Sequence, residues 1–217
     1  ETPTYKPPKK DLRFYIEDVR EKGCWTIVTV GRRIADRFLE PLPETQRVPI
    51  DDYVSCGPES IRSCELISAS EYRYELSSSA VDQLSETDVT FHWGVGIIGG
   101  AALRGPSEGI WGIHHGDLRN YRGGPPGFWE FVNEEPVGIS TLQRFTSELD
   151  GGDIVLEKTI GIENANTWRE VRRIMCRETI PMFAEGITSL LNGNPYNPPP
   201  NNLGPIRSPT DRTCKTT

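Results

Sequence analysis

Apolar residues gather into short runs in the second half of the chain. The runs 88–99 and 109–115 are nearly unbroken and end in glycine or polar residues. Short apolar runs between turn signals are typical of parallel strands that are covered on both faces. The segments 137–145 and 153–162 are rich in β-branched residues and predict two further strands. A short helix is expected at 80–86, ahead of the first run.

The clearest helix is predicted over 165–193. Thr167 and Glu170 have the spacing of a capping box, in which two side chains satisfy free N–H groups at the start of a helix. Pro181 is expected to kink the helix or to begin a new segment, and Gly193 suits its C-terminal end. Four residues recur at helical spacing and are interpreted as core positions: Trp168, Val171, Ile174 and Met175.

These elements indicate a single Rossmann-like α/β domain with a mainly parallel sheet, because strands alternate with helices or turns. We expect this domain to span residues 11–194, with strand-like runs at 12–19 and 24–31. Residues 1–10 are interpreted as a polar, proline-rich arm. Residues 195–217 are interpreted as a tail that is too rich in proline and asparagine to build a further domain.

The composition narrows the function classes. The chain has 217 residues and a formal net charge of -7, which disfavours a nucleic-acid partner because phosphate binding needs a concentrated basic face. No apolar run approaches the roughly 20 residues of a membrane helix, and the first residues do not resemble a signal peptide. The five cysteines form no CxxC pair, as expected of thiols in a reducing compartment. We therefore expect a cytoplasmic protein that binds neither nucleic acid nor membrane.

All three histidines of the chain, His92, His114 and His115, lie on or just beyond the two apolar runs. In open α/β sheets, ligands bind at the carboxyl ends of strands, so a site is expected there. A metal site is one alternative, since His114, His115 and Asp117 offer nitrogen and oxygen ligands and His92 could complete the set. Adjacent residues of a strand point to opposite faces, however, and we expect no metal.

The residues that follow the second apolar run carry a more specific pattern. They read His114, then Tyr121-Arg122-Gly123, Pro126 with Trp129, Val137-Gly138-Ile139 and Leu149-Asp150-Gly151-Gly152-Asp153-Ile154. Taken alone, Asp150 and its two glycines are a common turn. In this order and spacing, the segments together resemble the signature region of the formyltetrahydrofolate-dependent formyltransferases. That family includes methionyl-tRNA, glycinamide ribonucleotide and amino-sugar N-formyltransferases. The resemblance is specific over residues 88–158.

The resemblance implies transfer of the formyl group of 10-formyltetrahydrofolate to an amine, with His114 and Asp150 as catalytic residues. In the family, a histidine and an asparagine stabilise the developing oxyanion, and the aspartate orients the histidine and handles protons through water. Gly112 stands where the family has its asparagine, which removes one hydrogen-bond donor. We expect His115 to supply the missing donor, with an ordered water as the alternative.

Two further groups of residues align with the binding sites of the family. The folate is expected to contact Trp93, Val95, Gly96, Ile97, Ile98, Phe145, Thr146 and Glu148. The acceptor is expected to contact Asp117, Tyr121, Arg122 and Trp129. The apolar residues in both groups fit a protein core equally well.

Among the acceptors of the family, a nucleotide-linked amino sugar is expected here. The sequence shows no counterpart of the additional C-terminal barrel domain of the methionyl-tRNA enzymes. It also lacks the asparagine and the Pro-Ser-Leu-Leu-Pro loop expected of the glycinamide ribonucleotide enzymes. Three alternatives stay open: a formyltetrahydrofolate hydrolase, a non-catalytic folate or nucleotide-sugar binding module, and a metal hydrolase. A homodimer is also left open.

Overall fold

The computed structural model describes residues 64–70, 73–94, 96–194, 196–207 and 211. The contacts between Cα atoms separate the unit Cys64–Arg207 from a second unit formed by Glu1–Ser63 and Ser208–Thr217. Apart from Asp211, the second unit lies outside the described residues, and so do the strands predicted at 12–19 and 24–31. The domain limits expected from the sequence stay a prediction.

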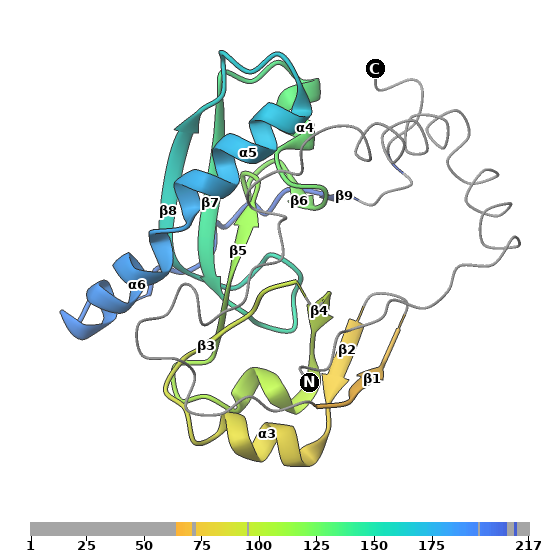
Figure 1. Ribbon diagram of the computed structural model, residues 1–217, viewed down its shortest axis with the longest axis vertical. Coiled ribbons are helices and arrows are strands. Elements are labelled where there is room, and N and C mark those ends of the chain that lie inside the picture. Colours follow the sequence, from red (N-terminus) through yellow and green to blue (C-terminus); the bar gives the residue numbers. More distant parts are fainter. Residues whose placement is uncertain (1–63, 71–72, 95, 195, 208–210, 212–217) are drawn as a thin grey trace, which may run out of the picture. The chain divides into compact units, whose positions relative to one another are not determined.

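A four-stranded mixed sheet forms the centre of the described unit (Figure 1). Its order is β3 (Thr90–Phe91), β5 (Ile110–His115), β7 (Val137–Arg144) and β8 (Asp153–Gly161). β3 and β5 are parallel, whereas β7 is antiparallel to both of its neighbours. The predicted α/β class is confirmed, and the sheets of the described residues are mixed, not mainly parallel. An apolar run indicates burial on both faces, which is typical of parallel strands but does not exclude an antiparallel neighbour.

The apolar run 88–99 forms two short strands in two different sheets, not one strand. β3 joins the four-stranded sheet, and β4 (Ile97–Ile98) pairs in parallel with β2 (Arg73–Leu76). β1 (Leu66–Ser68) completes this second sheet, antiparallel to β2. Gly94 and Gly96 adopt positive φ angles of 73° and 66° between the two strands. Because this left-handed conformation cannot continue a strand, the run breaks there.

Two consecutive helices, α5 (Trp168–Thr179) and α6 (Met182–Leu191), cover one face of the four-stranded sheet (Figure 1). The capping box predicted from Thr167 and Glu170 is confirmed, with both reciprocal hydrogen bonds present. Pro181 separates the two helices, as predicted, and Gly193 follows α6 with a φ of 74°. The core beneath α6 contains Trp111, Leu142 and Met182.

The remaining elements are shorter. They are α3 (Ser78–Leu84), the 3-10 helix η3 (Gly100–Arg104), β6 (Arg122–Gly123), α4 (Phe128–Val132) and β9 (Ile206–Arg207). α3 confirms the short helix predicted from the sequence at 80–86. β9 comes from the proline- and asparagine-rich segment and pairs in parallel with β6.

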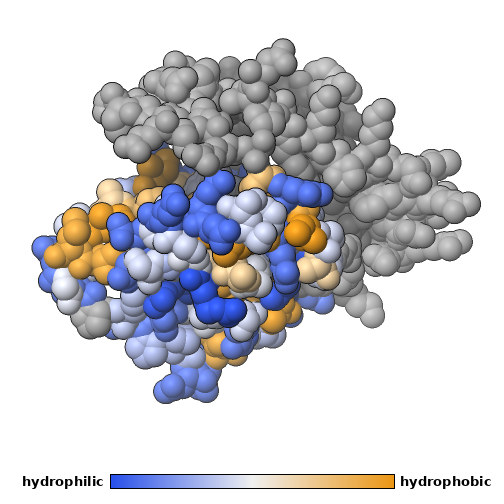
Figure 2. All heavy atoms as spheres, turned by 90° about the horizontal axis from the view of Figure 1, so that it is seen from below, coloured by the Kyte–Doolittle hydropathy of each residue, from blue (hydrophilic) through white to orange (hydrophobic). Residues whose placement is uncertain are grey.

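Among the described residues, no helix combines the length and the apolar composition needed to cross a bilayer. Figure 2 shows hydrophilic side chains over much of one face of the described unit, with apolar residues in smaller groups between them. Scattered apolar residues are normal on a protein surface.

Candidate active site

His114 is held at the end of β5 by contacts to both of its ring nitrogens. Nδ1 lies 3.3 Å from Asp150 Oδ2, and Nε2 lies 2.8 Å from the carbonyl oxygen of Tyr121. A carbonyl oxygen only accepts, so Nε2 carries the proton of that hydrogen bond. The contact with Asp150 is then attractive only in the form in which Nδ1 is also protonated. His114 and Asp150 are both largely buried, so water weakens this contact little.

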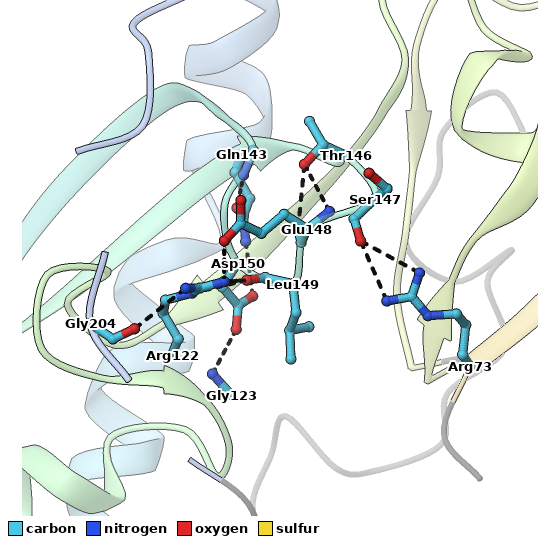
Figure 3. Close-up of polar contacts among 11 residues, drawn as sticks. Arg73, Arg122, Gly123, Gln143, Thr146, Ser147, Glu148, Leu149, Asp150 and Gly204 are labelled. Carbon is cyan, nitrogen blue, oxygen red and sulfur yellow. Dashed lines mark hydrogen bonds and ion pairs between the residues drawn. The ribbon is translucent and has the colours of Figure 1, made fainter. Parts of the chain in front are cut away.

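Asp150 lies in the connection between β7 and β8, and both of its carboxylate oxygens are occupied. Oδ2 accepts a 2.7 Å hydrogen bond from the backbone N–H of Gly123, and Oδ1 accepts one of 3.1 Å from Gln143 Nε2 (Figure 3). Its φ angle is 48°, in the left-handed region that non-glycine residues seldom adopt. The structure therefore brings together His114 and Asp150, the two residues that the resemblance assigned to catalysis.

Gln143 belongs to this group, although the sequence did not single it out. It is the cross-strand neighbour of Gly112, and only 1% of its surface is exposed. Its amide donates to Asp150, and its Oε1 accepts a hydrogen bond from the backbone N–H of Gly152. A glutamine inside an otherwise buried strand was the available signal, because a buried amide needs polar partners.

The structure does not bring His115 to the face of the sheet on which a second oxyanion donor was predicted. β5 continues through His115, so its side chain points to the face opposite His114. There His115 Nε2 lies 3.1 Å from Thr179 Oγ1 of α5. The hydroxyl of Thr179 donates to the carbonyl of Cys176, so it accepts from His115. Burial, together with the charges of His114 and Arg172, lowers the pKa of His115 to about 4.

Gly112, at the position of the asparagine of the family, is covered by an aromatic ring. A Cβ atom on Gly112 would overlap the ring of Phe145. Phe145 also packs edge-on against His92, with ring centroids 5.3 Å apart. Burial lowers the pKa of His92. The place of the missing amide is therefore filled by the ring carbons of Phe145, which pack against His92.

The residues expected to bind the acceptor do not form one exposed surface. Arg122 is 7% exposed, and its guanidinium donates to the carbonyls of Leu149 and Gly204 and to Glu148 (Figure 3). Trp129 is buried and lies under the guanidinium of Arg207, whose Cζ is 4.9 Å from the ring centroid. These two side chains are therefore packed inside the domain.

Asp117 and Tyr121 lie in the turn that follows β5. The carboxylate of Asp117 accepts hydrogen bonds from the backbone N–H of Arg119 and from the side chain of Asn120. Tyr121 donates from its hydroxyl to Glu135. The backbone N–H of Asp117 donates to Glu130. These bonds fix the turn that presents the Tyr121 carbonyl to His114.

Glu130 carries a buried carboxyl beneath this turn. Only 2% of its surface is exposed, and burial raises its pKa to about 7. Nearby Asp117 and Glu135 act in the same direction, because like charges favour the neutral form. The carboxyl of Glu130, which accepts a hydrogen bond from the turn after β5, therefore changes charge near neutral pH.

The residues expected to contact the folate are divided between two regions. Phe145, Thr146 and Glu148 lie in the connection that carries Asp150, and Thr146 and Glu148 are exposed. In the other region, Trp93 is 60% exposed, Gly96 is exposed and Ile97 belongs to β4. Ile98 packs in the core against Ala102 and Ile110, which removes it from any binding surface. Val95 lies outside the described residues.

The described residues contain no group of three or more histidine, cysteine, aspartate or glutamate side chains placed to hold a metal ion. His114 and His115 diverge to opposite faces of the sheet, so they cannot share one ion. Among the described residues, the geometry thus provides a buried histidine–aspartate pair.

Comparison with known proteins gives distant matches. No family model matches the chain. Methionyl-tRNA formyltransferase of Thermotoga maritima is 27% identical over 165 residues, which cover 76% of this chain and 47% of that protein. The protein of the same name from Thermotoga neapolitana is 30% identical over 97 residues, or 45% of this chain and 31% of that protein. The chain thus spans about half, or less, of the length of these relatives.

Solved structures match at lower identity. The formyltransferase PseJ from Anoxybacillus kamchatkensis, in complex with UDP-4,6-dideoxy-4-formamido-L-AltNAc and tetrahydrofolate, is 19% identical with a TM-score of 0.48. The match covers 57% of this chain and 65% of that chain. An N-formyltransferase from Helicobacter canadensis is 18% identical with a TM-score of 0.45, over 50% of this chain and 41% of that chain. By its sequence matches, the chain shows distant homology to methionyl-tRNA formyltransferases over part of their length.

Proposed function

We propose that the chain transfers the formyl group of 10-formyltetrahydrofolate to the amine of a small acceptor. The observation that carries the proposal is the buried contact between His114 and Asp150, in the segment that resembles the signature of the family. The amine nitrogen attacks the formyl carbon, the bond from that carbon to N10 breaks, and the proton of the amine passes to N10. Asp150 orients His114 and carries that proton through water, and His114 donates to the formyl oxygen.

The histidine needs a free N–H to do this. In the structure Nε2 donates to Tyr121, so the turn after β5 has to release it when the folate binds. Movement of a surface turn on ligand binding is common in enzymes. The folate is proposed to lie against Trp93, Gly96 and Ile97 and against the connection from Phe145 to Asp150.

For the acceptor we propose a nucleotide-linked amino sugar. The net charge of -7 disfavours a polyanion such as tRNA. Asp117 and Tyr121 are the residues of the predicted acceptor group that remain near His114. Arg122 and Trp129 are withdrawn from this role because both are buried.

A folate-binding module without transferase activity is the second candidate. Gly112 and the ring of Phe145 favour it, because they remove an oxyanion donor whose loss costs about 100- to 1,000-fold in rate in other enzymes.

The test incubates the purified chain with 10-formyltetrahydrofolate and measures tetrahydrofolate, formate and formylated amine. The acceptor panel contains nucleotide-linked amino sugars, glycinamide ribonucleotide and methionyl-tRNA, and His114→Ala and Asp150→Asn serve as inactive controls. Formylation of an amino sugar, lost in both variants, supports the proposal. Formate release without an acceptor indicates a hydrolase instead. Thermal stabilisation by 5-formyltetrahydrofolate without turnover indicates the binding module, and no stabilisation by folate overturns both.

A further inference from the structure

We propose that Arg122 is a positioning residue for Asp150, and that it sets the direction of this carboxylate through the peptide bond before it. The inference rests on the proposed function of the His114–Asp150 pair. The sequence placed Arg122 in the acceptor site, and the structure gives it a different set of partners.

Arg122 holds the carbonyl oxygen of Leu149. Its Nε donates to this oxygen over 3.0 Å, and Nη2 donates to the same oxygen. That carbonyl belongs to the planar peptide unit that joins Leu149 to Asp150. Fixing this plane fixes one end of the N–Cα bond of Asp150, and rotation about that bond is the φ angle. The unusual φ of 48° is therefore maintained by a charged donor pair on the neighbouring carbonyl.

The residue after Arg122 holds the carboxylate itself. The backbone N–H of Gly123 donates to Asp150 Oδ2 over 2.7 Å. The two residues of β6 thus act on the backbone and on the side chain of the same aspartate. β6 is anchored in turn, because it pairs with β9 and the N–H of Arg122 donates to the carbonyl of Pro205.

The guanidinium of Arg122 has few N–H groups left to bind a phosphate of a nucleotide-linked acceptor. Nη2 also contacts Glu148 Oε1 at 2.9 Å, and Nη1 donates to the carbonyl of Gly204 over 3.4 Å. A guanidinium stays charged when buried, so it needs these acceptors inside the domain. Figure 3 shows Arg122 between Gly204 and the segment Glu148–Asp150. A side chain used in this way positions the site and does not meet the acceptor.

The experiment compares Arg122→Met, which keeps the length without donors, with Arg122→Lys, which keeps one charged donor group. Arg73→Met is the matched control. Arg73 contacts the carbonyl of Ser147 in the same connection, at 3.4 and 3.5 Å, but does not reach Asp150. Circular dichroism verifies that each variant is folded. If Arg122→Met does not fold, the test uses Arg122→Lys alone.

The first readout needs no substrate. Hydrogen exchange of the Gly123 amide reports its bond to Asp150, and amides of the β7–β8 ladder report global opening. We expect exchange at Gly123 to accelerate about tenfold or more in Arg122→Met, less in Arg122→Lys and not in Arg73→Met, with the ladder amides changing less. Asp150→Ala removes the hydrogen-bond acceptor of the Gly123 amide and therefore shows the exchange rate expected when this bond is lost completely. Unchanged exchange at Gly123 in a folded Arg122→Met overturns the proposal.

The second readout is kinetic. We expect kcat to fall about 10- to 100-fold in Arg122→Met, with the Kd of 5-formyltetrahydrofolate and the KM of the acceptor changed less than threefold. A rise in the acceptor KM with kcat unchanged overturns the proposal in favour of the acceptor-binding role. If the wild-type chain shows no turnover, the proposed function fails, and the exchange of Gly123 still decides whether Arg122 positions Asp150.

Discussion

The ring of Phe145 lies where a side chain at residue 112 would stand. A Cβ atom on Gly112 would be 2.9 Å from Phe145 Cε1 and closer still to Cζ. Gly112 therefore differs from the asparagine of the family in shape as well as in chemistry. Restoring the amide requires the ring to move.

We expect Gly112→Asn to lower the free energy of unfolding by about 1–3 kcal/mol, the usual cost of overpacking. In a Phe145→Ala background the same substitution should cost less, because the obstructing ring is gone. Urea denaturation of the wild type, both single variants and the double variant measures the coupling between the two sites. Equal costs of Gly112→Asn in the two backgrounds would show that the ring is not the obstacle.

The two glycines after Asp150 should respond differently to alanine. A Cβ atom on Gly152 would overlap the backbone carbonyl of Arg144, whereas one on Gly151 would meet the side chain of Glu148. The side chain can turn away, and the carbonyl belongs to β7. We expect Gly152→Ala to destabilise the fold by about 3 kcal/mol or more and Gly151→Ala by about 1 kcal/mol. Thermal unfolding compares them, and equal losses would contradict this difference.

The carboxyl of Glu130 should make stability depend on pH. Its pKa is raised to about 7 by burial, so between pH 4.5 and 7 the folded state binds a proton that the unfolded state has lost. The free energy of unfolding therefore falls as the pH rises through this range. Glu130→Gln keeps an acceptor for the N–H of Asp117 and cannot ionise. We expect it to be more stable than the wild type at pH 8, by up to about 3 kcal/mol, and equal to it at pH 4.5.

Urea titrations at several pH values check this expectation. Glu134→Gln, an exposed carboxylate two residues beyond α4, is the control. A Glu130→Gln variant that parallels the wild type at every pH would show that Glu130 does not cause the slope.

His115 should contribute the opposite slope over an overlapping range of pH, so the slope of the wild type is the sum of the contributions of Glu130 and His115. Its pKa is lowered to about 4, chiefly by burial, so between pH 6.5 and 4 the unfolded state binds a proton that the folded state does not. Stability is therefore lost as the pH falls through this range. His115→Gln can still donate to Thr179 and takes up no proton. Between pH 7 and pH 4 we expect the free energy of unfolding of this variant to fall by about 1–3 kcal/mol less than that of the wild type.

The same variant tests the position of His115 relative to the site. Since its side chain lies on the face of the sheet opposite His114, His115→Gln should keep the wild-type turnover under the proposed function. A large loss of turnover with normal stability would return His115 to the catalytic group.

Local features were predictable from the sequence, and features that depend on distant partners were not. The start of α5 was predicted correctly because Thr167 and Glu170 stand within one helical turn and bond each other. The direction of β7 depends on how the chain returns after α4, which no residue of β7 encodes. His115 was expected beside His114, but β5 continues through it and places its side chain on the opposite face of the sheet.

The candidate site likewise contains residues that were predicted from the sequence and contacts that were not. His114 and Asp150 were identified through the resemblance to a family, and no local pattern connects them. The buried contacts of Arg122 were not predicted because its acceptors, the carbonyls of Leu149 and Gly204, are 27 and 82 residues away along the chain. Backbone carbonyls belong to every residue type, so a sequence cannot show which arginine will find them. Gln143 escaped notice for a related reason, since its partner Asp150 is not adjacent in sequence.

The left-handed backbone at residue 150 limits which acid the site can use. Aspartate and asparagine tolerate this conformation better than other side chains with a Cβ atom. Glutamate would meet the conformational cost and would also carry its carboxylate one methylene beyond the N–H of Gly123 and the amide of Gln143. Selection for a longer acid, which could reach a differently placed histidine, would therefore have to rebuild the connection between β7 and β8. In this chain the shape of the backbone restricts chemical variation at the site before any ligand is bound.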